Sequence, residues 1–178
     1  DINYHDYLVT DTLIGKNRLI GKSEEIKSLK SKITQFSDSN LPILITGEKG
    51  VGKEIVAKAI HEESSRKDEP FLTINCGAIA DSLLQSELFG HMAGSFSGAT
   101  SSHNGIFIEA GKGTVFLDEI GEISPAMQVA LLRVLENKEV RPIGGTQQIP
   151  FKCQILLATN ANLHELVENK SFREDLYY

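Results

Sequence analysis

The sequence predicts an α/β fold in three layers, with a mainly parallel sheet flanked by helices. Short apolar runs with the character of buried strands alternate with stretches of helical periodicity. Each of these runs ends in polar residues, and a glycine-rich loop follows the first of them. Because functional groups gather at the carboxyl ends of parallel strands, we expect one catalytic edge. The four expected strands cover residues 41–46, 71–74, 113–119 and 154–160.

The first helix is expected to begin after Ser23 and to end near residues 37–40. A serine hydroxyl is a good N-cap because it accepts a backbone N–H, and Glu24 and Glu25 suit the positive end of the helix dipole. Apolar residues follow at helical spacing and predict one buried face. They are Ile26, Leu29, Ile33 and Phe36.

Residues 47–54 form a glycine-rich loop between the first strand and a second helix, and this layout is typical of a phosphate-binding loop. Glycines let backbone N–H groups converge on phosphate oxygens, while the helix dipole and Lys53 add positive charge. The generic motif has Ser or Thr after the lysine to bind magnesium, but Glu54 stands there. The alternative is a glycine-rich turn without a ligand. The whole loop is Gly47, Glu48, Lys49, Gly50, Val51, Gly52, Lys53 and Glu54.

The middle of the chain is expected to be a helix over 81–89 with Asp81 as its cap, followed by an exposed loop. Residues 91–104 are rich in Gly, Ser and Ala and carry few large apolar side chains. Further on, Ser124 and Pro125 suit the N-cap and first position of another helix. The apolar face of that helix is expected to be Met127, Leu131, Val134 and Leu135.

The last third of the chain is expected to hold a hairpin and a short helix. Residues 139–150 contain the turn signal Pro-Ile-Gly-Gly, which predicts a hairpin. Asn162 is expected to cap the last short helix. Residues 172–178 have the pattern of a structured element.

Two acids, Asp118 and Glu119, follow the third strand. Phosphoryl transfer needs bound phosphates, a cation and an oriented water. Asp118 stands where an acid holds Mg²⁺ through its water shell, and Glu119 is placed to accept a proton from the attacking water. The alternative is a pair of solvated acids at a strand end. The phosphate loop upstream favours the functional interpretation.

Three further residues have both a functional and a structural interpretation. Asn160 suits a γ-phosphate sensor or a water-positioning residue, but also a turn after a strand. Asn75 either restrains Glu119 or ends the second strand. Arg173 is either an arginine that stabilises transition-state charge across a subunit boundary or a solvated surface residue.

Composition limits the classes of function. The chain is long enough for one domain with a core, and no stretch approaches the roughly 20 apolar residues of a membrane span. The net charge of −6 argues against DNA binding by this segment itself. Cys76 and Cys153 lack metal-site spacing and are expected to be inert core residues in a reducing cytoplasm. Residues 1–15 are expected to be a linker or tail, and residues 16–178 one domain.

Ordered matches along nearly the whole chain resemble the central AAA+ ATPase domain of NtrC-type bacterial enhancer-binding activators, which work with sigma-54 RNA polymerase. Several such transcription regulators are two-component response regulators. The family also has Glu at the position of Glu54. The matching segments are residues 47–54, 61–71, 75–76, 87–91, 114–119, 131–135, 158–160 and 172–178.

The resemblance implies ATP and Mg²⁺ as ligands and a P-loop NTPase fold of the AAA+ type. Lys53 would bind phosphates, Asp118 magnesium, and Glu119 would activate water. Asn75 would be the switch residue, and Asn160 the first sensor. The first of two arginines presented to the ATP of a neighbouring subunit would be Arg173, in a ring that is usually a hexamer.

The resemblance also implies a sigma-54 contact at the loop that reads Gly-Ala-Phe-Thr-Gly-Ala in the family. An aromatic residue between glycines on an exposed loop suits contact with a partner. Ser95 and Ser97 depart from the family pattern, and the methyl group missing from Ser97 is worth about 1 kcal/mol if buried at the contact. Met92 and Ala93 also depart from it, as do Lys49 and Val51 in the phosphate loop. This chain has Gly94, Ser95, Phe96, Ser97, Gly98 and Ala99 there.

The family continues beyond the last residue with a second arginine, a helical lid and usually a DNA-binding helix-turn-helix. We therefore expect this segment to bind ATP weakly, to hydrolyse it poorly and to be mostly monomeric, with DNA contacted only through that further domain. The leading hypothesis is an ATPase domain that remodels sigma-54 polymerase through the loop around Phe96. The alternative is a nucleotide-binding regulatory module without a productive sigma-54 contact.

Overall fold

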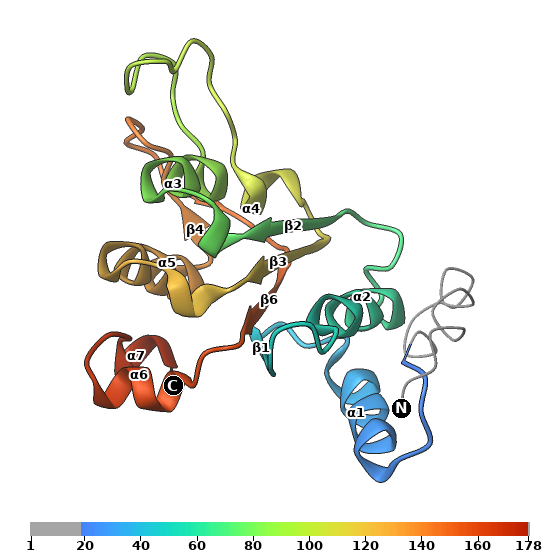
Figure 1. Cartoon of the computed structure of the whole chain (residues 1–178). Helices are drawn as coiled ribbons and strands as arrows, with labels where there is room; N and C mark the ends of the chain where they lie inside the picture. Colours follow the sequence, from blue (N-terminus) through green and yellow to red (C-terminus); the bar gives the residue numbers. More distant parts are fainter. Residues whose placement is uncertain (1–18, 178) are drawn as a thin grey trace.

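The structure is a computed structural model that describes residues 19–177. Four parallel strands form the central sheet in the order β1-β6-β3-β2 (Figure 1). The expected α/β fold with a parallel sheet is therefore confirmed, and the linker expected over residues 1–15 lies outside the described residues. The strands are β1 (Ile43–Thr46), β2 (Phe71–Asn75), β3 (Thr114–Asp118) and β6 (Gln154–Thr159).

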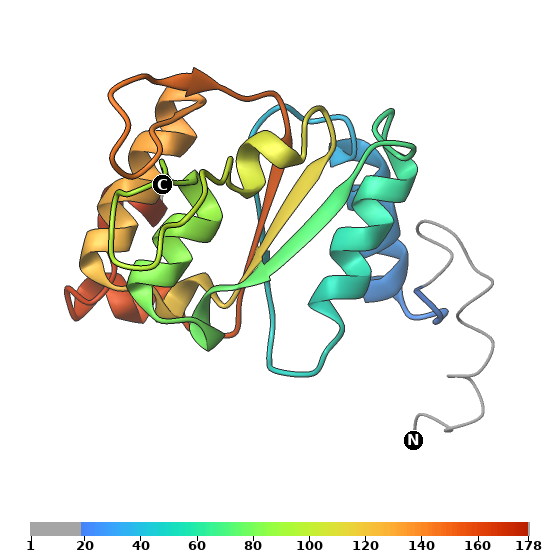
Figure 2. The same cartoon turned by 90° about the horizontal axis from the view of Figure 1, so that it is seen from above.

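Helices cover both faces of the sheet and give three layers (Figures 1 and 2). One face carries α1 (Glu24–Phe36) and α2 (Lys53–Glu63). The other face carries α3 (Asp81–Phe89), α4 (Ile106–Glu109), α5 (Pro125–Asn137), α6 (Leu163–Glu168) and α7 (Glu174–Tyr177).

The two faces of the sheet have separate apolar cores. In β3, Val115 and Leu117 pack against α3 and α5, whereas Phe116 packs toward α2. The alternation follows from the period of two in a strand. Strands buried on both sides read as continuous apolar runs, and this explains the composition of β3 and β6. The central strands are therefore fixed from both faces.

Most of the expected helix ends are confirmed. The hydroxyl groups of Ser23 and Ser124 and the side chain of Asn162 each accept a backbone N–H at the start of a helix. The cap expected at Asp81 is wrong by one residue. Ala80 is the N-cap, with extended backbone and no side-chain bond, and Asp81 is already helical. Its carboxylate instead lies in the first turn, where the helix dipole favours negative charge.

The buried face expected on α1 is only partly correct. Ile33 is buried, but Phe36 is 43% exposed. The reason is tertiary, because α1 packs mainly against α2 (Figure 1), and Ile33 is its one residue buried in the core between α2 and the sheet. Such a contact covers a narrow stripe of the helix, and the last turn of α1 extends beyond it.

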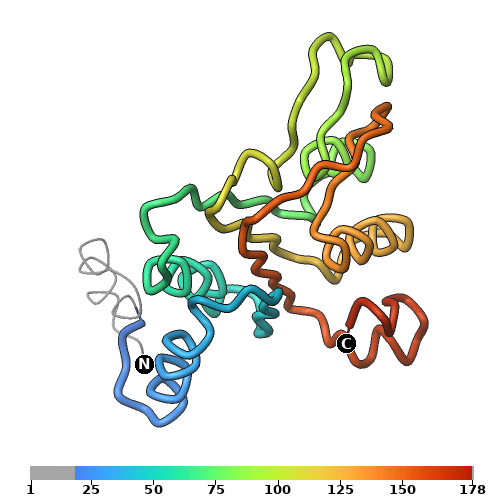
Figure 3. Tube along the Cα trace, turned by 180° about the vertical axis from the view of Figure 1, so that it is seen from behind, coloured from blue at the N-terminus to red at the C-terminus, as the bar shows by residue number. Residues whose placement is uncertain are grey.

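The expected hairpin is confirmed by β4 (Glu139–Val140), which pairs antiparallel with β5 (Ile149–Pro150). The turn of this hairpin and the loop over 91–104 extend together from the same side of the domain, as Figure 3 shows from behind. A bridge between His91 and Ile143 joins them. No helix within residues 19–177 is long and apolar enough to cross a membrane.

Candidate functional site

The phosphate loop connects β1 to α2, and the side chain of Lys53 at its end bonds back to carbonyl oxygens at its start. Lys53 Nζ donates to the carbonyl oxygens of Gly47 and Glu48, each at 2.9 Å. The backbone N–H of Gly47 donates to the carbonyl of Thr159 at 3.3 Å, which holds the start of the loop to the end of β6. The ammonium group is therefore held within the loop at the carboxyl edge of the sheet.

Backbone conformation explains the glycines of this loop. Gly50 and Gly52 have φ angles of +84° and +91°, in the left-handed region that favours glycine. Gly52 is also the N-cap of α2 and gives the helix no side-chain cap. The first amides of α2 thus have no side-chain acceptor, and the positive end of the helix is open to an anion. These features fit a bound phosphate chain.

Glu54 does not replace the missing hydroxyl group. Its carboxylate makes an ion pair with Lys58 at 2.8 Å on the exposed surface of α2. Lys49 and Val51 are also exposed. The backbone of the loop and Lys53 are therefore the groups available to bind phosphates, and Asp118 remains the residue expected to hold Mg²⁺.

Asp118 and Glu119 lie at the end of β3. Asp118 pairs with Asn75 in the β2–β3 register, and its Oδ1 accepts the backbone N–H of Glu119 at 2.9 Å. Glu119 has a φ of +57°, in the left-handed region, and is the N-cap of the short 3₁₀ helix η4 (Ile120–Glu122). A non-glycine residue held there costs about 1–3 kcal/mol, and such strain is common at functional sites.

Asn75 lies beside this acid pair but its oxygen is already engaged. Asn75 Oδ1 accepts the backbone N–H groups of Gly77 at 2.9 Å and Ala78 at 3.1 Å, which caps the 3₁₀ helix η3 (Cys76–Ala78). A Cβ atom at Gly77 would lie 2.7 Å from Oε2 of Glu119. The end of β2 and the Glu119 carboxylate are therefore in close contact through Gly77.

Asn160 is exposed directly after β6. The buried Thr159 before it accepts the backbone N–H of Ala161 through Oγ1 at 3.0 Å. A Cβ atom at Gly121 would lie 2.9 Å from Thr159 Oγ1 and 2.8 Å from Ala161 Cβ. The close approach that glycine permits brings η4 against the end of β6, so Asn160 adjoins the turn that carries Glu119.

The two cysteines are buried and unpaired, so the expected core positions are confirmed. Burial, and to a smaller extent the nearby charges of Asp118 and Glu119, raise the pKa of the Cys76 thiol to about 12. Burial likewise raises the pKa of Cys153 to about 12. Both thiols remain protonated at neutral pH and are poor nucleophiles.

Arg173 lies apart from the acid pair. Its guanidinium group is exposed and makes two bonds to Asp175, Nε to Oδ1 at 2.9 Å and Nη2 to Oδ2 at 2.6 Å. This pairing raises the pKa of Arg173, chiefly through the hydrogen bond. Arg173 therefore lies at the surface and bonds Asp175, and not the phosphate loop or the acid pair of its own chain, within the described residues.

The loop over 91–104 is held mainly at its base. His91 and His103 exchange two backbone hydrogen bonds of 2.8 Å. His91 Nδ1 lies 2.7 Å from Ser86 Oγ and Nε2 lies 2.9 Å from the carbonyl oxygen of Ser101. Phe96 is 45% exposed and packs edge-on to the His91 ring, with centroids 5.0 Å apart.

The tip of this loop is a compact turn. Ala99 N–H donates to the Phe96 carbonyl at 3.0 Å, and Gly94 N–H donates to the Ala99 carbonyl at 2.8 Å. Gly94 and Gly98 have φ angles of +78° and +102°. Ser97 is exposed. Phe96 therefore projects from a turn that depends on glycine.

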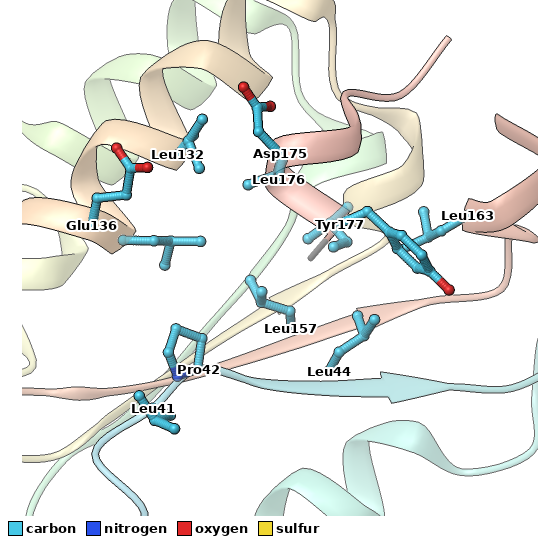
Figure 4. Close-up of a pocket in the computed structure, with 12 residues that line it drawn as sticks. Leu41, Pro42, Leu44, Leu132, Glu136, Leu157, Leu163, Asp175, Leu176 and Tyr177 are labelled. Carbon is cyan, nitrogen blue, oxygen red and sulfur yellow. The ribbon is translucent and has the colours of Figure 1, made fainter. Parts of the chain in front are cut away.

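An apolar cavity of about 460 Å³ lies elsewhere, between β1, α5 and α7 (Figure 4). Leu44, Leu132 and Leu157 line it, and Glu136 and Asp175 add negative charge. It includes no residue of the phosphate loop. Neither its lining nor its charge suits a triphosphate, so this cavity is a poorer candidate for a nucleotide site than the phosphate loop.

Sequence reasoning missed three residues that shape the site. Gly77 permits the close approach of η3 to Glu119, and Gly121 permits that of η4 to the end of β6. The sequence signal that could have identified them is a glycine shortly after the polar end of a strand. Gln128 is buried on α5, four residues after Ser124 and three before Leu131. This spacing places Gln128 on the buried face of α5, whereas a polar amide is ordinarily expected on the exposed face.

The fold and the edge together define a P-loop NTPase domain. A crystal structure of NtrX from Brucella abortus in complex with ATP has a TM-score of 0.81 and 33% identity, covering 97% of this chain and 36% of that chain. The P-loop NTPase domain of a sigma-54 transport activator from E. coli shares the fold at 19% identity and a TM-score of 0.58, covering 89% of this chain and 91% of that chain.

The chain belongs to the family described as the Sigma-54 interaction domain, which matches residues 19–178. It is 48% identical to the transcriptional regulator VasH of Vibrio cholerae, over 90% of this chain and 30% of that protein. It is 49% identical to a Nif-specific regulatory protein of Bradyrhizobium diazoefficiens, over 90% of this chain and 28% of that protein. The response regulator PilR of Pseudomonas aeruginosa is 46% identical. The chain thus spans about a third of such relatives or less.

Proposed function

We propose that this domain hydrolyses ATP within a ring of subunits in the cytoplasm and uses that reaction to remodel sigma-54 RNA polymerase through the loop around Phe96. The observation that carries the proposal is the junction at Gly77. There, the Glu119 carboxylate touches the segment that leads from β2 through η3 and α3 to the Phe96 loop. A change at Glu119 would be passed through this non-bonded contact to Gly77 and from there along the continuous chain to the Phe96 loop.

The residues of the chain divide the chemistry between them. Lys53 and the amides of residues 47–52 hold and orient the phosphates of ATP. Asp118 holds Mg²⁺, which neutralises charge on the transferring phosphoryl group. Glu119 accepts the proton of the attacking water, and Asn160 orients that water. Arg173 leaves Asp175 and stabilises the charge at the ATP of the neighbouring subunit.

The partner contact rests on exposure and attachment. Phe96 is a large apolar side chain that is nearly half exposed, at the end of a loop held chiefly by hydrogen bonds at its base. Duplex DNA is not expected to bind this acidic segment itself, so any DNA contact would come from another part of the whole protein.

The test uses the full-length protein with sigma-54 polymerase on a closed promoter complex. Phe96→Ala should keep ATP hydrolysis and lose open-complex formation, and Glu119→Gln should lose both while still binding ATP. If Phe96→Ala retains full open-complex formation, Phe96 is not the contact, and if the unmodified protein hydrolyses ATP but forms no open complex, the domain acts as a nucleotide-dependent regulatory module without that contact. The packing of Phe96 on His91 makes this second function worth testing.

A further inference from the structure

Gln128 is a buried amide that holds together three separate parts of the chain. It is 1% exposed on α5. Nε2 donates to the carbonyl oxygens of Ile123 at 3.1 Å and Ser171 at 3.0 Å, and Oε1 accepts the backbone N–H of Arg173 at 2.9 Å. Both N–H donors and one acceptor site of the amide are therefore used by backbone groups.

The Arg173 end of this network has few other attachments. The N–H groups of Ser171 and Phe172 both donate to the carbonyl of Leu166 in α6, at 2.8 and 3.0 Å. The next N–H along the chain, that of Arg173, turns away and donates to Gln128. Phe172 is buried, the carbonyl of Arg173 accepts the N–H of Tyr177 at 3.2 Å, and the Arg173 guanidinium bonds Asp175. The bond to Gln128 is the one that ties the Arg173 backbone to α5.

The other end of the network lies at the turn of the acid pair. Ile123 is the C-cap of η4, and Glu119 is its N-cap. The bond from Gln128 to Ile123 therefore ties the turn that carries Glu119 to the backbone that carries Arg173. The chemistry of the amide is specific, because a carboxylate at this position would face two carbonyl oxygens and an apolar side chain would leave three backbone groups unpaired.

The geometry points to Gln128 as a positioning residue that fixes the backbone of Arg173 and so the direction in which this arginine is presented to the neighbouring subunit. This inference rests on the proposed trans role of Arg173. Gln128 is buried and its amide bonds only backbone groups. The turn that carries Glu119 is also held by the close approach of Gly121 to Thr159 and Ala161, so the Arg173 backbone depends on Gln128 more than the Glu119 turn does. Loss of Gln128 should therefore reduce turnover at the neighbour's site more than at its own.

The experiment mixes two forms of the full-length protein. Lys53→Ala subunits supply only Arg173, and Arg173→Ala subunits supply only an ATP site, so a mixture restores turnover if Arg173 acts in trans. Gln128→Met is then added to one form or the other. In the arginine-supplying form it should lower kcat at least about tenfold with KM for ATP nearly unchanged, since small misplacements of a catalytic group cost one to two orders of magnitude.

The matched control is Gln154→Met. Gln154 is also buried, and its Nε2 donates to the carbonyl oxygens of Ser37 and Ser39, at the opposite end of β6 from Asn160. This variant loses comparable hydrogen bonds and should leave kcat in the mixture within about twofold, because substitutions remote from the site act through stability. Equal losses from Gln154→Met, or from Gln128→Met in either form, would overturn the positioning role.

A second measurement separates this inference from the proposed function. Amide hydrogen exchange at Arg173 should accelerate in Gln128→Met and stay unchanged in Gln154→Met. If the unmodified mixture restores no turnover, the trans role of Arg173 fails and the effect of Gln128 on catalysis fails with it. Unchanged exchange at Arg173 in Gln128→Met would instead overturn the anchoring itself, whatever the mixture does.

Discussion

The catalytic edge and the Phe96 loop are held by different forces. At the edge, Asp118 and Glu119 follow β3, whose residues are buried on both faces of the sheet. The loop over 91–104 is instead held mainly by hydrogen bonds, at its base, to Ile143 of the hairpin and within its own tip, with one ring contact between Phe96 and His91. Packing of β3 positions the two acids proposed for catalysis, whereas hydrogen bonds mainly position the loop proposed for partner contact.

This difference suits a domain in which one part must stay constant while another moves. Packed cores have few alternative arrangements, but loops held by a few exposed hydrogen bonds open at low cost. The Gly77 contact with Glu119 joins the two regions. Each of the following experiments tests one side of the comparison or the junction.

The largest expected effect is on stability, at Phe116. This ring is 2% exposed between β3 and α2. Phe116→Ala should lower the free energy of unfolding by about 3–5 kcal/mol because it leaves a cavity. Phe96→Ala, the matched change in the loop, should lower it by less than about 0.5 kcal/mol. Urea denaturation of both variants measures this, and similar losses would show that the loop is part of the core.

The second effect is on turnover, at Glu119. Glu119→Gln should lower kcat of the full-length protein by about 10²–10⁴-fold, because the amide cannot accept the proton. ATP affinity should change little. The control is Glu122→Gln, an exposed glutamate in the same 3₁₀ turn, which should hydrolyse ATP normally. If the Glu119→Gln protein has an unimpaired kcat, Glu119 is not the general base.

The third effect is at the junction, and it is smaller. Gly77→Ala places a Cβ atom 2.7 Å from Oε2 of Glu119, closer than a normal contact, so the flexible carboxylate should move and kcat should fall about tenfold. The denaturation midpoint should hardly change. Combining Gly77→Ala with Glu119→Asp, whose side chain is shorter, should cost no more than Glu119→Asp alone. Additive losses would indicate that the two residues act independently.

Much of the fold and of the candidate site followed from local pattern. The strands, the glycine loop and the caps at Ser23 and Ser124 were predicted because each depends on residues close in sequence. Asp118 and Glu119 were identified for the same reason, as polar residues at the end of an apolar run. The roles assigned to the individual site residues stay predictions.

The misses came from tertiary packing. Phe36 was placed in the core because helical spacing cannot show where along α1 the packing against α2 and the core ends. Gln128 was passed over because its partners are 5 and 43–45 residues away, so no window around it shows why an amide is needed. Likewise, the need for glycine at Gly121 arises from β6, about 40 residues further along.

The smallest expected effect is a pH dependence on the α2 side of the sheet. His61 is buried with Nδ1 2.9 Å from Thr114 Oγ1, and burial lowers its pKa below the ordinary value of 6.5. Between the native and the unfolded pKa of His61, the unfolded chain binds more protons than the native one. The free energy of unfolding should therefore fall as the pH drops below 6.5, and the contribution of His61 should be constant above it.

Denaturation at a series of pH values measures how steeply the free energy of unfolding falls. His61→Gln should flatten this dependence, whereas His164→Gln, at an exposed position, should not. If His61→Gln keeps the full pH dependence of the free energy of unfolding, the acid sensitivity originates outside the His61–Thr114 pair. Water then reaches His61 more easily than the packing around β3 implies.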